Sequence, residues 1–175
     1  MDAFSSLMLL VLPALVIVAG LKDATSFTIP NWISAAVVLA FAPAAAAAMM
    51  AGADLGDNGV HLGIGAAALI VGMGMWSVRW IGGGDAKLFA ASALWLGWPA
   101  IGPYLLVTAI AGAALSLMIL NLRAGWARAF VPVGPRWVER LREEGGDVPY
   151  GVAIAIGALA AFPDSTLVHL LARPL

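Results

Sequence analysis

Long apolar runs alternate with short polar loops along the whole chain. The runs lie near residues 4–21, 31–51, 59–78, 88–98, 101–120 and 150–172. An α-helix needs about 20 apolar residues to cross a bilayer, and all the runs except the short fourth approach this length. Because backbone groups in lipid must pair within their own segment, the runs predict helices, and the alternating segments typical of an outer-membrane barrel are missing. The pattern predicts an all-α, polytopic integral membrane protein with about six transmembrane helices.

The fourth and fifth runs could form one long helix or two shorter ones. Glycine, tryptophan and proline cluster at residues 97–103, midway along this stretch, and supply turn formers. One uninterrupted helix would also send the arginines of residues 123–142 to the non-cytoplasmic side, against the usual distribution of positive charge. We therefore predict two spans here.

Composition supports the membrane class. Hydrophobic residues make up 62% of the chain and charged residues 11%, which is more apolar surface than a soluble domain of this size can bury. The chain has no cysteine, which excludes a disulfide framework, a thiolate zinc module and a cysteine nucleophile. The first run follows Met1 and Asp2 without the basic flank of a secretory signal, so we expect a retained helix. With no internal repeat, residues 1–175 are expected to form a single domain.

Basic residues are concentrated on one side of the predicted topology. These residues are Lys22, Arg79, Lys87, Arg123, Arg128, Arg136, Arg140 and Arg142. Arg173 alone falls on the other side, where the loops near residues 52–59 and 98–103 contain no basic residue. Cytoplasmic loops retain Lys and Arg, so both termini are predicted on the non-cytoplasmic side. All seven tryptophans lie near predicted span ends, as expected for rings that prefer the headgroup level.

The loop of residues 121–149 is predicted to be cytoplasmic and to contain one short helix. Residues 136–144 read Arg-Trp-Val-Glu-Arg-Leu-Arg-Glu-Glu and precede two glycines, as a helix precedes its C-terminal cap. Trp137, Val138 and Leu141 would share one face. This helix is interpreted as an interfacial anchor, or alternatively as a surface that contacts a substrate or partner.

Most acidic and histidine residues have a structural interpretation. An Asp at mid-span costs roughly 2.5 to 3.5 kcal/mol, so each such residue needs an explanation. Asp54 and Asp57 lie in a glycine-rich outer loop and are expected to be solvated. Asp164 is expected to be a polar break or a partner of His169. His61 and His169 lack ligand spacing, so no metal site is expected.

Asp23 and Asp85 are predicted to lie on the cytoplasmic side, at the ends of helices that can pack together. Asp23 precedes Ile29-Pro30-Asn31, where the proline favours the first turn of the second span. Asp85 ends Gly82-Gly83-Gly84-Asp85, in which the glycines allow another backbone to come close. Two apposed carboxyl groups share a proton, which provides one acid and one base for attack of water on a peptide. Alternatively, Asp23 caps a helix and Asp85 pairs with a nearby basic residue.

Three motifs together resemble the type IV prepilin peptidases of the Gly-x-Gly-Asp aspartic class. The first joins Asp23 to Ile29-Pro30-Asn31, and the second is Gly82-Gly83-Gly84-Asp85-Ala86-Lys87-Leu88. The third is Pro149-Tyr150-Gly151 with the Val-Ala-Ile that follows it. The likeness spans nearly the whole chain and is greatest to small, peptidase-only members that serve Flp-type, tight-adherence pili. Larger relatives carry a methyltransferase region with paired cysteines, which this chain lacks, so methylation is not expected.

The resemblance implies a membrane aspartic endopeptidase that removes the short basic leader from prepilins or pseudopilins, at the cytoplasmic face of the bacterial inner membrane. Asp23 and Asp85 would form the catalytic dyad. The residues that would shape the site are Gly82, Gly84, Lys87, Pro30, Asn31, Pro149, Tyr150 and Gly151. No cofactor, metal or nucleic acid is expected, and the implied partners are the prepilin and membrane lipids.

Two other functions fit parts of the sequence. A presenilin-like protease shares the Gly-x-Gly-Asp element, but its first aspartate is expected beside a tyrosine and its last motif is Pro-Ala-Leu. Here Lys22 precedes Asp23 and the last motif is Pro-Tyr-Gly. A non-catalytic scaffold or small transporter subunit would use the acidic residues for packing or proton movement.

Overall fold

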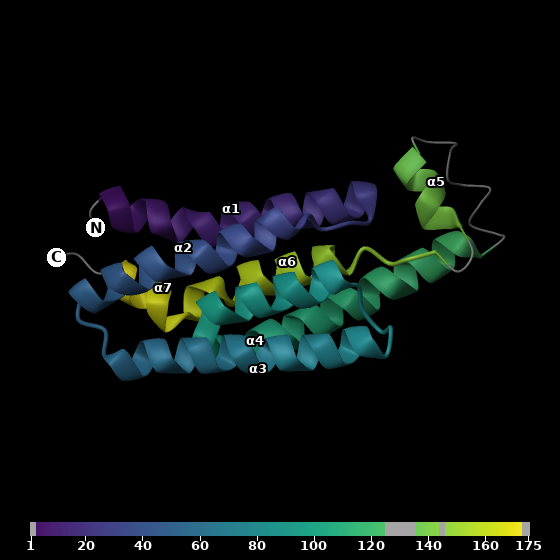
Figure 1. The fold of residues 1–175 in the computed structure, drawn as a ribbon. Coiled ribbons are helices and arrows are strands. Elements are labelled where there is room, and N and C mark those ends of the chain that lie inside the picture. Colours follow the sequence, from purple (N-terminus) through teal and green to yellow (C-terminus); the bar gives the residue numbers. More distant parts are fainter. Residues whose placement is uncertain (1–2, 125–135, 144–145, 173–175) are drawn as a thin grey trace.

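The structure of the protein is a computed structural model that describes residues 3–124, 136–143 and 146–172. Every regular element in these residues is a helix (Figure 1). The helices are α1 (Ala3–Ser26), α2 (Asn31–Met50), α3 (Leu55–Ser77), α4 (Gly83–Arg123), α5 (Arg136–Arg142), α6 (Tyr150–Ala161), the 3₁₀ turn η2 (Phe162–Asp164) and α7 (Thr166–Leu171). The predicted all-α class is confirmed.

Among the residues that the structure describes, four helices, α1 to α4, are long and apolar enough to cross a membrane. Their outer faces carry large apolar side chains that no other part of the described chain covers, such as Leu10, Leu39 and Ile70. A soluble monomer rarely exposes so much apolar surface, whereas a bilayer solvates it. The arrangement is that of a multi-pass membrane protein.

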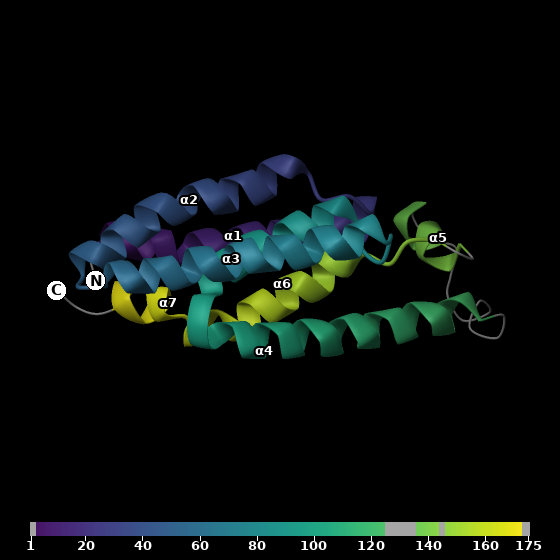
Figure 2. The ribbon, with the colours of Figure 1, turned by 60° about the horizontal axis from the view of Figure 1, so that its bottom comes forward.

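α4 reverses direction at Gly97, which has φ 60° and ψ −154°. A positive φ favours glycine because it has no Cβ. The two arms, residues 83–96 and 99–123, run antiparallel (Figure 2). The rings of Phe89 and Tyr104 stack with their centroids 5.3 Å apart, although residues this far apart in a straight helix would be about 22 Å apart. The break predicted from the glycine and proline cluster is confirmed, and six membrane crossings remain a prediction.

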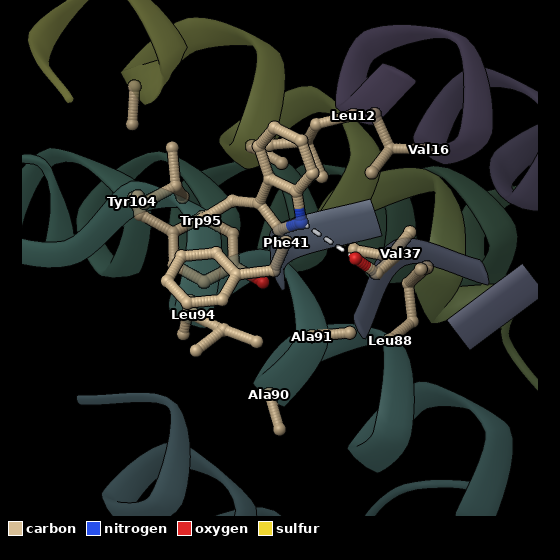
Figure 3. Packing of buried hydrophobic residues seen from close by; sticks show 14 of the residues in the cluster. Leu12, Val16, Val37, Phe41, Leu88, Ala90, Ala91, Leu94, Trp95 and Tyr104 are labelled. Carbon is tan, nitrogen blue, oxygen red and sulfur yellow. Dashed lines mark hydrogen bonds between the residues drawn. The ribbon is translucent and has the colours of Figure 1, made fainter. Parts of the chain in front are cut away.

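The first arm of α4 forms the centre of the bundle (Figure 3). The Trp95 indole Nε1–H donates a hydrogen bond to the Val37 carbonyl oxygen of α2 at 2.7 Å. Phe41 meets the Trp95 ring edge-on, with centroids 6.2 Å apart. Leu88 and Leu96 on the same arm are fully buried. Gly72 of α3 approaches Ala86, and Gly84 approaches Ile29 just before α2, so the beginning of this arm is held in place from two sides.

The helix ends gather at two opposite ends of the bundle. The start of α1 and the end of α7 lie at one end, whereas the end of α1, the end of α3, the start of α4 and α5 lie at the other (Figure 1). α5 lies within the helix predicted for residues 136–144. Glu144, the last residue of that prediction, is outside the described residues.

The last apolar run is not one continuous helix. α6 ends in the η2 turn, which contains Pro163 and the exposed Asp164, and α7 follows. A proline that cannot donate a hydrogen bond interrupts the helix there. Asp164 therefore lies in a polar break. The Ser165 hydroxyl after the turn donates to the Trp95 carbonyl oxygen at 2.9 Å.

One local prediction needs refinement, and His61 has a structural role that was not predicted. Asp57 is not merely solvated, because its carboxylate accepts a hydrogen bond from the Asp54 backbone N–H at 3.1 Å and caps the start of α3. His61 is 2% exposed and is hydrogen-bonded to the Leu94 carbonyl oxygen and the Thr166 hydroxyl, each at 2.9 Å. His61 therefore links α3, α4 and α7 inside the bundle.

Candidate active site

Asp23 lies near the end of α1 and is only 5% exposed. Its Oδ2 accepts a hydrogen bond from the backbone N–H of Gly151, in the first turn of α6, at 2.7 Å. A Cβ at residue 151 would lie 2.9 Å from this oxygen and 2.7 Å from Ile29 Cδ1. Glycine is therefore required at 151, because only glycine lets the start of α6 come this close to the Asp23 carboxylate. The unpaired backbone N–H groups at a helix start favour a negatively charged group there.

Asp85 lies in the first turn of α4. Its Oδ2 accepts a hydrogen bond from the Gly82 backbone N–H at 3.1 Å, as an acidic residue does in a capping box. Its other oxygen, Oδ1, is buried and has no hydrogen-bond partner among the described residues. Since buried acceptors are normally paired, this oxygen marks a position where a water or substrate group would bind.

The two carboxyl groups converge although they come from different helices. Asp23 and Asp85 interact electrostatically, and the Gly151 N–H, which is hydrogen-bonded to Asp23, also lies near enough to Asp85 to interact with it electrostatically. Both residues line one cavity of about 440 Å³ at the end of the bundle where α1 and α3 end. Binding cavities for small ligands and short peptide segments have volumes of this order.

The Pro30-Asn31 and Gly84-Lys87 motifs join the start of α2 to the start of α4. Pro30 is the residue before α2. The Lys87 ammonium donates to Asn31 Oδ1 at 2.8 Å, so Lys87 ties the two helices together and does not pair with Asp85. A Cβ at Gly84 would lie 3.1 Å from Ile29 Cβ and 3.3 Å from its carbonyl oxygen. These contacts fix the loop that follows Asp23.

The Pro149-Tyr150-Gly151 motif forms one wall of the cavity. Pro149 is buried directly before α6, and Tyr150 is half-buried and lines the cavity. The Tyr150 hydroxyl packs against Gly112 on the second arm of α4, where a Cβ would clash with it. The motif therefore holds the start of α6, and with it the Gly151 N–H, against the end of α1.

Sequence reasoning missed several residues of the cavity wall. Trp76, Arg79 and Trp80, from the end of α3 and the turn after it, line the cavity, as does Phe27. Phe27 and Arg79 have φ values of 55° and 61°, which are strained for residues other than glycine and are frequent at functional sites. In the sequence, these tryptophans are explained equally well as rings at the level of the lipid headgroups. Only their position just before the Gly-Gly-Gly-Asp motif could have pointed to the cavity.

Asp147 is a third acidic residue at the cavity, and sequence reasoning also missed it. It is exposed and interacts electrostatically with both Asp23 and Asp85. The Arg123 guanidinium holds the segment around it, because Nη2 donates to the carbonyl oxygens of Gly146 at 2.9 Å and Asp147 at 3.2 Å. One basic side chain at the end of α4 thus positions this edge of the cavity.

The described residues contain no group of three or more histidine, aspartate or glutamate side chains arranged to hold a metal ion. The chemistry available in the cavity is that of the paired Asp23 and Asp85 carboxyl groups, with the exposed Asp147 at the edge, together with backbone N–H donors and one buried oxygen that has no partner among the described residues. Paired carboxyl groups can exchange one proton with a water and a substrate.

The sequence profile of the type IV leader peptidase family matches residues 10–117, which is more than half of the chain. This chain belongs to the type IV leader peptidase family. Both aspartates and the Gly-Gly-Gly-Asp motif lie within the part that matches this leader peptidase family, whereas α6 lies beyond it.

Several curated relatives are similar to parts of this leader peptidase family member. The prepilin leader peptidase/N-methyltransferase of Burkholderia pseudomallei is 32% identical over 107 residues, which cover 55% of this chain and 29% of that protein. The protein of the same name from Legionella pneumophila is 40% identical over 55 residues, 31% of this chain and 19% of the relative. The protein of the same name from Aeromonas hydrophila is 34% identical over 71 residues, which cover 35% of this chain and 24% of the relative. The chain thus matches less than a third of each relative's length, and no solved structure matches it.

Proposed function

We propose that this leader peptidase family member is a membrane aspartic endopeptidase that cleaves the short basic leader from prepilins, with Asp23 and Asp85 as its catalytic pair. The observation that carries the proposal is the convergence of these two carboxyl groups in one cavity, where Asp85 Oδ1 is buried and has no hydrogen-bond partner among the described residues. Membership of the family supports the substrate class.

The reaction follows from the shared proton. The ionised aspartate takes a proton from a water held between the carboxyl groups, and the water oxygen attacks the scissile carbonyl carbon. The protonated aspartate donates a hydrogen bond to the carbonyl oxygen, and the pair then delivers a proton to the departing amine as the C–N bond breaks. Asp85 Oδ1 is the acceptor available for the water. The Gly151 and Gly82 N–H groups keep both carboxyl groups oriented.

The proposal includes six crossings, with the cavity facing the cytoplasm and both termini on the opposite side. The two arms of α4 supply the fourth and fifth crossings, and α6 to α7 supply the sixth. Support comes from charge, since Lys22, Arg79, Lys87 and Arg123 lie near helix ends on the same side as the aspartates. A prepilin helix in the inner membrane would then present its leader at the cavity.

We further propose that the protein is a peptidase of the Flp type without methyltransferase activity. The loop between α1 and α2 contains only residues 27–30, which leaves no room for an inserted cytoplasmic region. The sequence also lacks cysteine. Both features match the peptidase-only pattern that the motifs resemble.

The test is leader removal from a co-expressed prepilin, followed by the shift in the prepilin's size on a gel. Asp23→Asn and Asp85→Asn should each lower the cleavage rate by roughly 10²- to 10⁴-fold, because each removes an acid–base group. The matched control is Asp164→Asn, an exposed acid in the η2 turn that does not line the cavity, which should cleave normally. A non-catalytic scaffold would remove no leader in the wild type or in any variant, and near-wild-type cleavage by either dyad variant, with normal folding, would refute the assignment.

A further inference from the structure

A second groove, of about 570 Å³, opens between α2 and α3 with the first arm of α4 as its floor. α2 and α3 make almost no contact with each other in the described part of the chain. The walls are apolar and include Val38, Leu39 and Leu69. The floor includes Ala90, Ala91 and Leu94, whose side chains on α4 are drawn in Figure 3. The groove shares no lining residue with the aspartate cavity.

Lys87 lies at one end of this groove. Its ammonium group is exposed and donates a hydrogen bond to Asn31 Oδ1 at 2.8 Å. An ammonium group has three N–H donors, so two donors stay available. Among the described residues no carboxylate is paired with this charge. The groove therefore combines an apolar channel with an uncompensated positive charge at its end.

The length of α2 gives the depth of that charge. The helix has 20 residues and begins at Asn31, and at 1.5 Å per residue it spans about 30 Å, the thickness of the hydrocarbon core. Asn31 and the Lys87 ammonium that binds it thus lie at the level of the lipid headgroups. The groove runs from there along α2 to Leu39, which is about 12 Å into the bilayer.

A second polar group lies one helical turn deeper. Ser34 lines the groove and is only 6% exposed, and its hydroxyl has no hydrogen-bond partner among the described residues. Buried hydroxyl groups are normally paired. Ser34 lines the groove, so its hydroxyl is a hydrogen-bond donor at this level of the groove. In a glycerophospholipid the ester carbonyl groups lie just deeper in the bilayer than the phosphate. Ser34 likewise lies deeper than Lys87, so the two polar groups of the groove follow the same order.

We propose that this groove is a binding site for an anionic glycerophospholipid. Lys87 and Asn31 bind the phosphate, the Ser34 hydroxyl donates to an ester carbonyl oxygen, and one acyl chain lies over the small residues of the α4 floor. The unpaired positive charge selects a lipid with net negative charge over a zwitterionic one. The lipid would touch neither aspartate, although it would bind at the Lys87–Asn31 contact that supports the loop after Asp23.

The test is native mass spectrometry of the full chain in detergent, titrated with phosphatidylglycerol or with phosphatidylcholine. Phosphatidylglycerol should bind more tightly. Lys87→Gln should weaken it about tenfold, because one charge-assisted contact is lost, and should leave phosphatidylcholine little changed. The control Lys22→Gln removes the same charge from an exposed site outside the groove and should have no effect. Equal affinity for the two lipids, or equal effects of the two lysine changes, would overturn the proposal.

A second pair of variants tests the place of binding. Ala66→Phe fills the groove, whereas Ala67→Phe adds the same ring at an exposed neighbour outside it. Only the first should abolish the bound phosphatidylglycerol. A wild-type dimer that Ala66→Phe converts to monomers, with lipid binding unaltered, would assign the groove to a second copy of the chain and contradict the proposal. Because the readout is bound lipid, the result does not depend on leader cleavage.

Discussion

Gly151→Ala separates the position of the dyad from its chemistry, because it leaves both carboxyl groups in place. The added methyl group would lie 2.7 Å from Ile29 Cδ1, 2.9 Å from Asp23 Oδ2 and 3.0 Å from Asp23 Cβ. All three distances are well below van der Waals contact, so the start of α6 and the end of α1 must move apart. Overpacking of this kind costs about 1–3 kcal/mol of folding free energy.

The same displacement lengthens the 2.7 Å hydrogen bond from the Gly151 N–H to Asp23. A misplacement of about 1 Å in a catalytic group lowers a rate by roughly 10²-fold. We therefore expect leader cleavage by Gly151→Ala to fall by about that factor in membranes that contain equal amounts of folded protein. Thermal unfolding in detergent measures the accompanying loss of stability.

Gly74→Ala is the matched control, since an added Cβ at this helical position meets no atom within 4 Å. It should be neutral or slightly stabilising, as alanine is favoured over glycine in a helix. Wild-type cleavage by Gly151→Ala would refute the reasoning. A rate that falls only in proportion to the folded fraction would also refute it, because the contact would then be structural alone.

Three further predictions concern the supports of the site. Gly97→Ala should destabilise the protein by about 1–3 kcal/mol in thermal unfolding, because at this positive φ the added Cβ would clash with the His61 ring. The control Gly102→Ala has no neighbour within 4 Å and should leave stability unchanged. Equal effects of the two changes would contradict the chain reversal at Gly97. Thr166→Val removes the hydroxyl that is hydrogen-bonded to His61 and should lower the free energy of unfolding by about 1 kcal/mol. Unchanged stability would argue against that link. Arg123→Met should slow leader cleavage roughly tenfold by releasing the cavity edge, and normal cleavage would contradict its positioning role.

The presence of the helices could largely be predicted from the sequence, because helix formation in lipid depends on short, contiguous segments. A run of about 20 apolar residues in lipid must form a helix, and α1, α2 and α3 follow their apolar runs closely. The reversal of α4 was also predictable, because Gly97 and its proline neighbours disfavour a continuous helix. The interruption of the last run was less clear, since Pro163 could have produced only a kink.

The site was predictable in part. The two aspartates could be assigned to one side from charge distribution alone, but their orientation depends on contacts between distant segments. The Gly151 N–H reaches Asp23 only because α6 packs against α1, and no local pattern encodes this. His61 has the same limitation, because its partners Leu94 and Thr166 are remote in sequence. The Asp54 and Asp57 cap, by contrast, has a recognisable spacing that the sequence reasoning overlooked.

The central claim is that Asp23 and Asp85 act as one catalytic unit. The most direct measurement compares leader cleavage rates of Asp23→Asn, Asp85→Asn and the double variant under identical conditions. Groups that work as a unit are not additive, so the double variant should be no slower than either single variant. Losses that multiply in the double variant, or near-wild-type cleavage by either single variant, would contradict the account.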